Sequence, residues 1–214
     1  MLVLTVDQKA STTRGDRVPQ VLELLRALTD GRDGIVLPFE RTVGDEVQAL
    51  LSADDAGSAL AVDITLTLLR DGEWWVGIGA GPVDEPLPDV SRAASGPAFV
   101  RARAAVERAK SRRSAAPVAV VGPDDGPGAR SAADAEAVLR LLGALAARRS
   151  DAGWEAIDSL TARGDGSAPQ RAAAQALGVS EQAVSQRLRT ALWAEEEAVR
   201  PLVGRLLKES GTGE

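Results

Sequence analysis

Hydrophobic and polar positions along the first 121 residues follow two spacings, one typical of strands and one of helices. Apolar residues three and four positions apart predict helices at 18–28, 56–69 and 97–110. Short apolar runs bounded by polar turns predict strands at 2–6, 35–39, 47–51, 74–79 and 118–121. The segment 40–46 could close a hairpin between the second and third of these strands. The leading order βαββαβ predicts an α+β fold of ferredoxin-like type, with helices packed on one face of the sheet.

From residue 124 onward the pattern becomes helical. The polar segment 124–128, rich in Gly and Pro, is the best candidate for a domain boundary. Apolar stripes then predict a connecting helix at 132–149 and a shorter helix at 154–160, before an interruption at 162–167. We therefore expect an α+β domain, a linker with its connecting helix, and an all-α helix-turn-helix domain, at 1–123, 124–150 and 151–214.

The segment that begins at Pro169 has the local signals of a helix-turn-helix. Pro169 suits the first turn of a helix, where its missing N–H costs nothing, and this helix extends to Leu177. Gly178 supplies a left-handed turn, and Ser180 caps a second helix at 181–193. Such a pair of helices places its second helix in the major groove of DNA. A helical hairpin that only packs or dimerises has the same local signals.

The second of these helices has one apolar and one polar face. The polar face is a row at i, i+3, i+4 and i+7, formed by Gln182, Ser185, Gln186 and Arg189. In the major groove Gln pairs with adenine, Arg with guanine or phosphate, and Ser with either. Candidates for phosphate contacts are Arg171, Arg187 and Arg189. The segment 163–193 holds four arginines and two acidic residues, a local charge of +2, and we expect double-stranded DNA as the partner.

Composition narrows the possible chemistry. The 214 residues include no cysteine and no histidine, which excludes disulfides, thiolate or imidazole metal sites and a Ser-His-Asp triad. Any catalysis would depend on carboxylates with Mg²⁺ or Mn²⁺. The net charge of −6 argues against nonspecific nucleic-acid binding by the whole surface, but not against a small basic module. No signal-like start and no run of about 18 apolar residues is found, so we expect no membrane partner and a cytoplasmic location.

Three segments occur in the order found in the SatD family, namely Thr42–Leu51, Val76–Pro82 and Gly96–Arg103. Together with the C-terminal helix pair, they make the chain resemble this family over nearly its full length. The resemblance implies a two-part protein with a DNA-binding end. The chain departs from the family at Val47, where members tend to have Phe after Gly-Asp-Glu. It also has Asp7 between Val6 and Gln8, where members tend to have an acidic residue in a Gly-Asp context.

The N-terminal layout is also similar to the catalytic palm of class III nucleotidyl cyclases and diguanylate cyclases. Those enzymes place one Asp at the end of the first strand and another in the hairpin, where the two hold divalent metals on nucleotide phosphates. Asp7 and Asp45 match these positions and would hold Mg²⁺ or Mn²⁺. The nucleotide site that the resemblance implies would consist of Asp7, Asp45, Glu46, Arg101 and Arg103.

Two functions stay open at this point. The first is a sequence-specific DNA-binding regulator, whose degenerate cyclase-like domain serves for dimerisation or ligand sensing. The second is a metal-dependent nucleotide enzyme with accessory helices. The catalytic Asn and Arg of the cyclases correspond to Val100 and Ala104, which favours the regulator. Turn chemistry alone also accounts for Gly-Asp in a hairpin. Specific sites are commonly bound by dimers, so we expect a homodimer through the N-terminal domain or the helix at 132–149.

Three smaller features complete the expectations. Gly77, Gly79 and Gly81 lack the spacing of a dinucleotide-binding loop and indicate a strand packed closely on its neighbours. Trp74 and Trp75 should face opposite sides of their strand, one of them in the core. The acidic run 195–197 is expected to begin the final helix as a solvated face.

Overall fold

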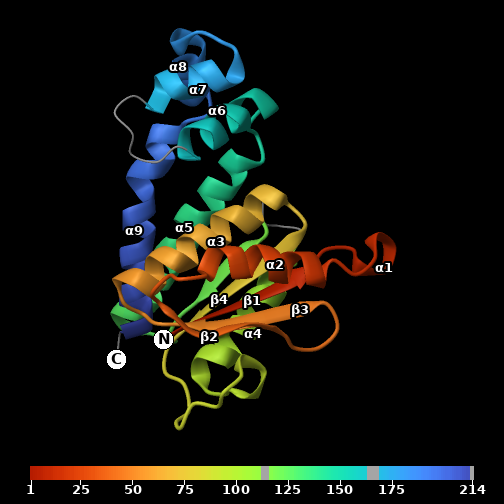
Figure 1. The fold of residues 1–214 in the computed structure, drawn as a ribbon. Coiled ribbons are helices and arrows are strands. Elements are labelled where there is room, and N and C mark those ends of the chain that lie inside the picture. Colours follow the sequence, from red (N-terminus) through yellow and green to blue (C-terminus); the bar gives the residue numbers. More distant parts are fainter. Residues whose placement is uncertain (112–115, 163–168, 213–214) are drawn as a thin grey trace. The chain divides into compact units, whose positions relative to one another are not determined.

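The computed structural model describes residues 1–111, 116–162 and 169–212 (Figure 1). The chain divides into two compact units, 1–147 with 201–214, and 148–200. The first unit combines a β-sheet with helices, and the described part of the second unit is helical. The α+β fold class expected from the sequence is therefore confirmed.

One mixed sheet of five strands lies in the described part of the first unit. Its strands are β1 (Leu2–Gln8), β2 (Ile35–Arg41), β3 (Glu46–Leu51), β4 (Trp74–Ala80) and β5 (Val118–Val121). Their order across the sheet is β2-β3-β1-β4-β5. All neighbours pair antiparallel except β4 and β5, which are parallel. The central strand β1 has buried Leu2, Val3 and Leu4, because helices cover both faces of the sheet.

Two helices, α2 (Val18–Thr29) and α3 (Asp55–Asp71), cover one face of this sheet (Figure 1). The buried side of α2 repeats every three to four residues, as the sequence predicts. Asp54 caps the start of α3, and its carboxylate accepts the N–H of Gly57 at 2.8 Å. The predicted polar turn after the first strand contains the single-turn helix α1 (Ser11–Arg14).

Helix α4 (Pro97–Ala109) packs on the opposite face of the sheet (Figure 1). Its backbone approaches β4 at two glycines. A Cβ atom on Gly77 would lie 2.3 Å from the Val106 nitrogen, and one on Gly79 would lie 2.1 Å from the Ala98 oxygen. The expectation of close packing at these glycines is confirmed. The expectation that helices pack on one face alone is wrong, because the glycines make a second face accessible to a helix. The short helix η1 (Ser91–Ala93) precedes α4.

Trp74 and Trp75 face opposite sides of β4, as expected. Trp74 is buried, and its Nε1 donates to an oxygen of Asp71 at 2.7 Å. Trp75 is half-buried on the side of α4, and the Lys9 ammonium lies 4.8 Å from its ring centroid.

Helix α5 (Gly126–Ala146) belongs to the first unit and protects the outer edge of β5. The carboxylate of Glu136 accepts the N–H of Val120 at 2.7 Å, and Arg140 Nε donates to the Val118 oxygen at 3.4 Å. Arg108 on α4 donates to the Val120 oxygen at 3.1 Å. Side chains thus occupy backbone groups that another strand could otherwise pair with.

The last helix, α9 (Trp193–Thr212), begins in the second unit and ends in the first. In the first unit Lys208 pairs with Asp55 at 2.9 Å, and the Met1 ammonium donates to the Gly211 oxygen at 3.2 Å. The limits of the units therefore differ from the predicted limits 123/124 and 150/151. The Gly- and Pro-rich composition points to a boundary in the loop before α5. The units are instead set by packing, because α5 and the end of α9 pack in the first unit. No stretch of the described helices has the length and hydropathy required to cross a bilayer.

Candidate nucleic-acid interface

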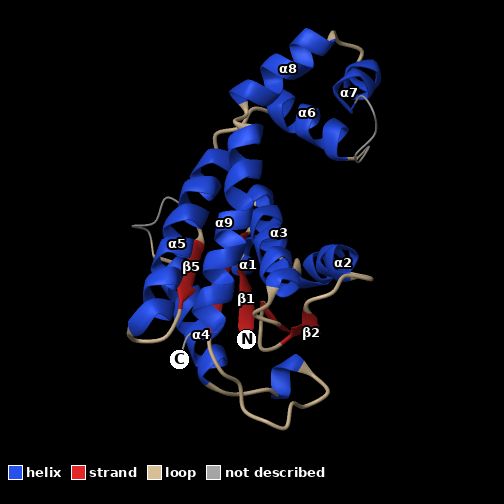
Figure 2. Ribbon diagram, turned by 90° about the vertical axis from the view of Figure 1, so that its left-hand side faces the viewer, coloured by secondary structure: helices blue, strands red, loops and turns tan. Residues whose placement is uncertain are grey.

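Three short helices lie together in the second unit (Figure 2). They enclose a small apolar core. They are α6 (Asp151–Thr161), α7 (Pro169–Leu177) and α8 (Glu181–Thr190), and each contacts the other two. The buried core residues are Ala156, Ile157, Ala173, Ala174, Val184, Leu188 and Ala191. Four of the seven are alanines, so the helices can approach closely and fix one face of α8. The predicted interruption at 162–167 lies, apart from Ala162, outside the described residues.

The turn between α7 and α8 is held by local backbone contacts. Gly178 has a φ of 64°, a left-handed conformation that glycine adopts without steric cost. The N–H of Val179 donates to the Ala174 oxygen at 3.0 Å. Ser180 Oγ accepts the N–H of Ala183 at 3.1 Å and so caps α8. The roles predicted for Gly178 and Ser180 are confirmed.

The outward face of α8 carries the predicted polar row. Val184 and Leu188 lie in the core on the inward face. On the outward face, Ser185 is half-buried. The other three side chains of the row are exposed, namely Gln182, Gln186 and Arg189. The helix ends at Thr190 rather than at the predicted Trp193, because Leu192 has a φ of 52° and interrupts the helical geometry. The whole row still lies on one helix of 10 residues.

Hydrogen bonds join the last part of this row. Arg189 Nη1 donates to Gln186 Oε1 at 3.0 Å, and Gln186 Nε2 donates to Thr190 Oγ1 at 3.3 Å. Both ends of the Gln186 amide are therefore engaged within the helix. One N–H of the Arg189 guanidinium is used in this way, out of the five that the group carries.

The two other arginines assigned to DNA differ in their surroundings. Arg171 is exposed on α7. Arg187 is half-buried and turned toward α6, where its Nη1 lies 3.4 Å from a carboxylate oxygen of Glu155. The structure thus brings Gln182, Ser185, Gln186 and Arg189 together, while Arg187 points away from this row.

Arg149 is a buried cation of the second unit that the sequence did not single out. Its side chain is 1% exposed and its Nη1 lies 2.7 Å from a carboxylate oxygen of Glu196, whose side chain is 6% exposed. Its Nε donates to the Ala191 oxygen, next to the end of α8, at 2.8 Å. The guanidinium lies 4.8 Å from the ring centroid of Trp154 and 6.0 Å from that of Trp193.

This arginine changes the interpretation of the acidic run at 195–197. The run lies near the start of α9, as expected, and Glu195 and Glu197 are exposed. The expectation of a wholly solvated run is wrong for Glu196, which pairs with Arg149 and also lies 3.4 Å from Arg200. The sequence signal that could have pointed to this buried arginine is that two of the chain's four tryptophans lie within residues 148–200.

A second group of predicted residues meets at one end of the sheet in the first unit. Asp7 on β1 lies opposite Glu46 on β3, and Asp45 precedes Glu46 in the hairpin. Lys110 Nζ lies 3.0 Å from an oxygen of Asp7, and Arg103 Nη2 lies 3.3 Å from an oxygen of Glu46. Burial raises the pKa of Asp7, although its hydrogen bond with Lys110 acts in the opposite direction.

Arg101 lies away from these carboxylates. Its Nη1 donates to the Ala80 oxygen at 2.9 Å, and Ala80 lies opposite Leu2 at the start of β1. Asp7 lies five residues further along β1, a separation of about 17 Å. The predicted nucleotide site is therefore not assembled as a whole, because Arg101 and Arg103 project from α4 toward different parts of the sheet.

Two of the carboxylates at this end of the sheet already have partners within the fold. Asp7 is neutralised by Lys110, and the oxygen of Glu46 that faces Arg103 also accepts the hydroxyl of Thr42 at 2.7 Å. Within the described ranges, no group of three or more acidic side chains is arranged to hold a metal ion. A divalent ion would have to displace these existing partners.

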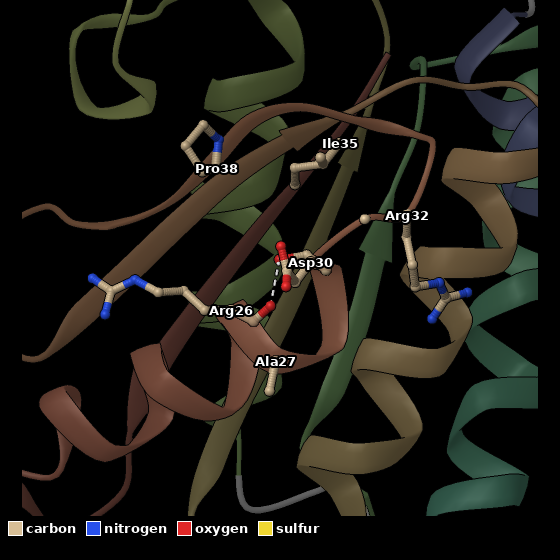
Figure 3. Close-up of a pocket in the computed structure, with 8 residues that line it drawn as sticks. Arg26, Ala27, Asp30, Arg32, Ile35 and Pro38 are labelled. Atoms are coloured by element: carbon tan, nitrogen blue, oxygen red, sulfur yellow. Dashed lines mark hydrogen bonds between the residues drawn. The ribbon is translucent and has the colours of Figure 1, made fainter.

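Two hollows of the first unit also lack converging polar groups. One lies beside the end of α2, where Arg26 and Arg32 extend away from each other (Figure 3). Arg32 forms a salt bridge with Asp63, in which Nη2 lies 2.7 Å from a carboxylate oxygen. The other hollow lies at the start of α4, where carboxylates of Asp84 and Asp124 line the same space as Arg101. An anion in the second hollow would meet these acidic residues, and in the first hollow the two arginines do not converge on one point.

The polar row on α8 is therefore the candidate site with side chains turned outward to a partner. It combines amide, hydroxyl and guanidinium groups on one rigid helix. Comparison with known proteins adds no assignment to it: no protein-family model, no curated protein and no solved structure matches this chain.

Proposed function

We propose that the chain is a sequence-specific double-stranded DNA-binding protein, a transcriptional regulator whose α7 and α8 form a helix-turn-helix. The observation that carries this proposal is the polar row on α8, formed by Gln182, Ser185, Gln186 and Arg189 on the face opposite the core. These are the side-chain types that recognise base edges in the major groove. The tight turn and the cap at Ser180 support a fixed recognition helix.

Size and charge are consistent with this use of α8. Ten helical residues span about 15 Å, and the major groove is about 12 Å wide, so the helix fits the groove. From residue 169 to residue 193 the chain has three arginines and one glutamate, a charge of +2, within a protein of net charge −6. A local positive field on an acidic protein favours a specific site over nonspecific coating of DNA.

For the first unit we propose a ferredoxin-like palm that senses a ligand or dimerises, as in the regulator suggested by the SatD resemblance. The order β2-β3-β1-β4 supports this topology. The pairing of Asp7 with Lys110 and of Glu46 with Arg103 supports a role other than metal-dependent catalysis. A homodimer would supply the two recognition helices that half-sites one helical turn apart require.

Selection of duplexes from a random-sequence library with the full chain tests the proposal. The wild type is expected to enrich a defined sequence, and Arg189→Ala is expected to bind that duplex roughly 5- to 150-fold more weakly, by loss of one bidentate base contact. Arg205→Ala is the matched control, because Arg205 is exposed on the part of α9 in the first unit. Failure of the wild type to enrich any sequence would reject the proposal.

A further inference from the structure

The two glutamines of the polar row have different surroundings. Gln182 is exposed at the start of α8, and its side chain makes no hydrogen bond with another described residue. Gln186 is engaged at both ends of its amide, by Arg189 at Oε1 and by Thr190 at Nε2. The two glutamines therefore differ in whether the side-chain amide is already hydrogen-bonded within the helix.

A glutamine that pairs with adenine needs both ends of its amide. The Oε1 atom accepts from the adenine amino group while Nε2 donates to the ring nitrogen. Gln186 would have to break both of its intrahelical hydrogen bonds to do so. Gln182 can make the same pair without breaking a contact to the described residues.

Arg189 can recognise guanine without giving up its hydrogen bond to Gln186. Its bond to Gln186 uses Nη1 and leaves other N–H groups of the guanidinium for the two acceptors on the guanine edge. A hydrogen bond from a neighbouring side chain also restricts the rotation of a long arginine, which reduces the entropy lost on binding.

We infer that Arg189 recognises a guanine, that Gln182 recognises an adenine, and that Gln186 is a positioning residue for Arg189. This inference rests on the proposed function and specifies the DNA sequence class of that site. Gln182 and Arg189 are separated by seven residues, or about 10 Å along the helix. At 3.4 Å per base pair, the guanine and the adenine lie about three base pairs apart in each half-site.

Base preferences of full-length variants test this assignment. From the same random-duplex library, the wild type is expected to select a guanine and an adenine at this spacing. Gln182→Ala is expected to remove the preference at the adenine alone. Arg189→Ala is expected to remove the preference at the guanine, with a loss of affinity of roughly 5- to 150-fold.

Variants of Gln186 separate positioning from direct recognition. Gln186→Ala is expected to weaken the preference for guanine and to leave the adenine preference unchanged. Gln186→Glu keeps an oxygen acceptor for Arg189, so the guanine preference is expected to return even if the added charge lowers overall affinity. Gln175→Ala on α7 is the matched control, because Gln175 is exposed and outside the row.

Three results would each contradict a different part of this assignment. Loss of an adenine preference in Gln186→Ala, with the guanine preference intact, would overturn the positioning role. A selected duplex whose base preferences are the same for wild type and Arg189→Ala would overturn the inference while DNA binding itself stands. Enrichment of no duplex by the folded wild type, checked by circular dichroism, would reject the proposed function and this inference together.

Discussion

Burial of a charged side chain is costly unless the charge is paired, and Arg149 has an ion-pair partner in Glu196. It contacts Glu196, the oxygen of Ala191 and the ring of Trp154. Arg149 comes at the start of the second unit, while Ala191 and Glu196 come near its end. One residue thus joins the two ends of the unit beside the helix that we assign to DNA.

Arg149→Ala is expected to destabilise the second unit by about 3–5 kcal/mol, because the change leaves Glu196 buried without its closest cation. Thermal melting and tryptophan emission of the full chain would measure the loss. Arg148→Ala is the matched control, since Arg148 is exposed next to it and should change stability by less than about 0.5 kcal/mol. Equal stability of the two variants would show that the pair does not hold the unit.

At the scale of helices and strands, the sequence predicts those turns and caps that depend only on residues close together along the chain. The turn at Gly178 and the cap at Ser180 depend on neighbours within a few residues, and both were predictable. The face on which α4 packs was not predictable, because the approach at Gly79 involves Ala98 from another element. For the same reason the sequence grouped Arg101 with Asp7, which lies toward the other end of β1.

The N-cap of α3 gives a prediction at this scale. Asp54→Ala is expected to lower the free energy of unfolding by about 1 kcal/mol at neutral pH, because Gly57 loses its acceptor. Hydrogen bonds from the Gly57 N–H and the Ser52 hydroxyl lower the pKa of Asp54. Urea unfolding of the full chain would measure the difference.

The sign of the pH effect follows from this lowered pKa. A carboxyl whose pKa is lower in the folded state stabilises the protein above the ordinary value of about 4. That stabilisation is lost as the pH falls through the folded-state pKa, so wild type and Asp54→Ala should converge on acidification. Asp33→Ala, at an exposed loop position, should show no comparable difference. A stability difference for Asp54→Ala that stays constant down to pH 3 would contradict the capping role.

At the scale of the whole molecule, the two units differ in the chemistry that they offer a partner. The second unit presents an outward polar row on α8. In the first unit, Asp7 and Glu46 are already paired with Lys110 and Arg103. These acidic side chains are thus used within the fold. This difference is consistent with our proposal that the protein acts by binding DNA through α8.

Titration with ATP or GTP and Mn²⁺ checks the assignment of the first unit. Neither the wild type nor Asp45→Ala is expected to show metal-dependent turnover, because the carboxylates beside Asp45 already have cationic partners. Product formation followed by chromatography would be the measurement, with Asp33→Ala as the exposed-acid control. Turnover that Asp45→Ala abolishes and Asp33→Ala retains would make the first unit an enzyme.

The most direct test of the central claim is an equilibrium titration of the selected duplex, beside a shuffled duplex of the same composition, at increasing salt. We expect tighter binding of the selected duplex at every salt concentration and a steep fall of affinity with salt. Arg171→Ala should weaken binding to both duplexes and reduce the salt slope by about 1, whereas Arg189→Ala should remove the difference between them. Equal affinity of the wild type for the two duplexes would contradict sequence-specific DNA binding.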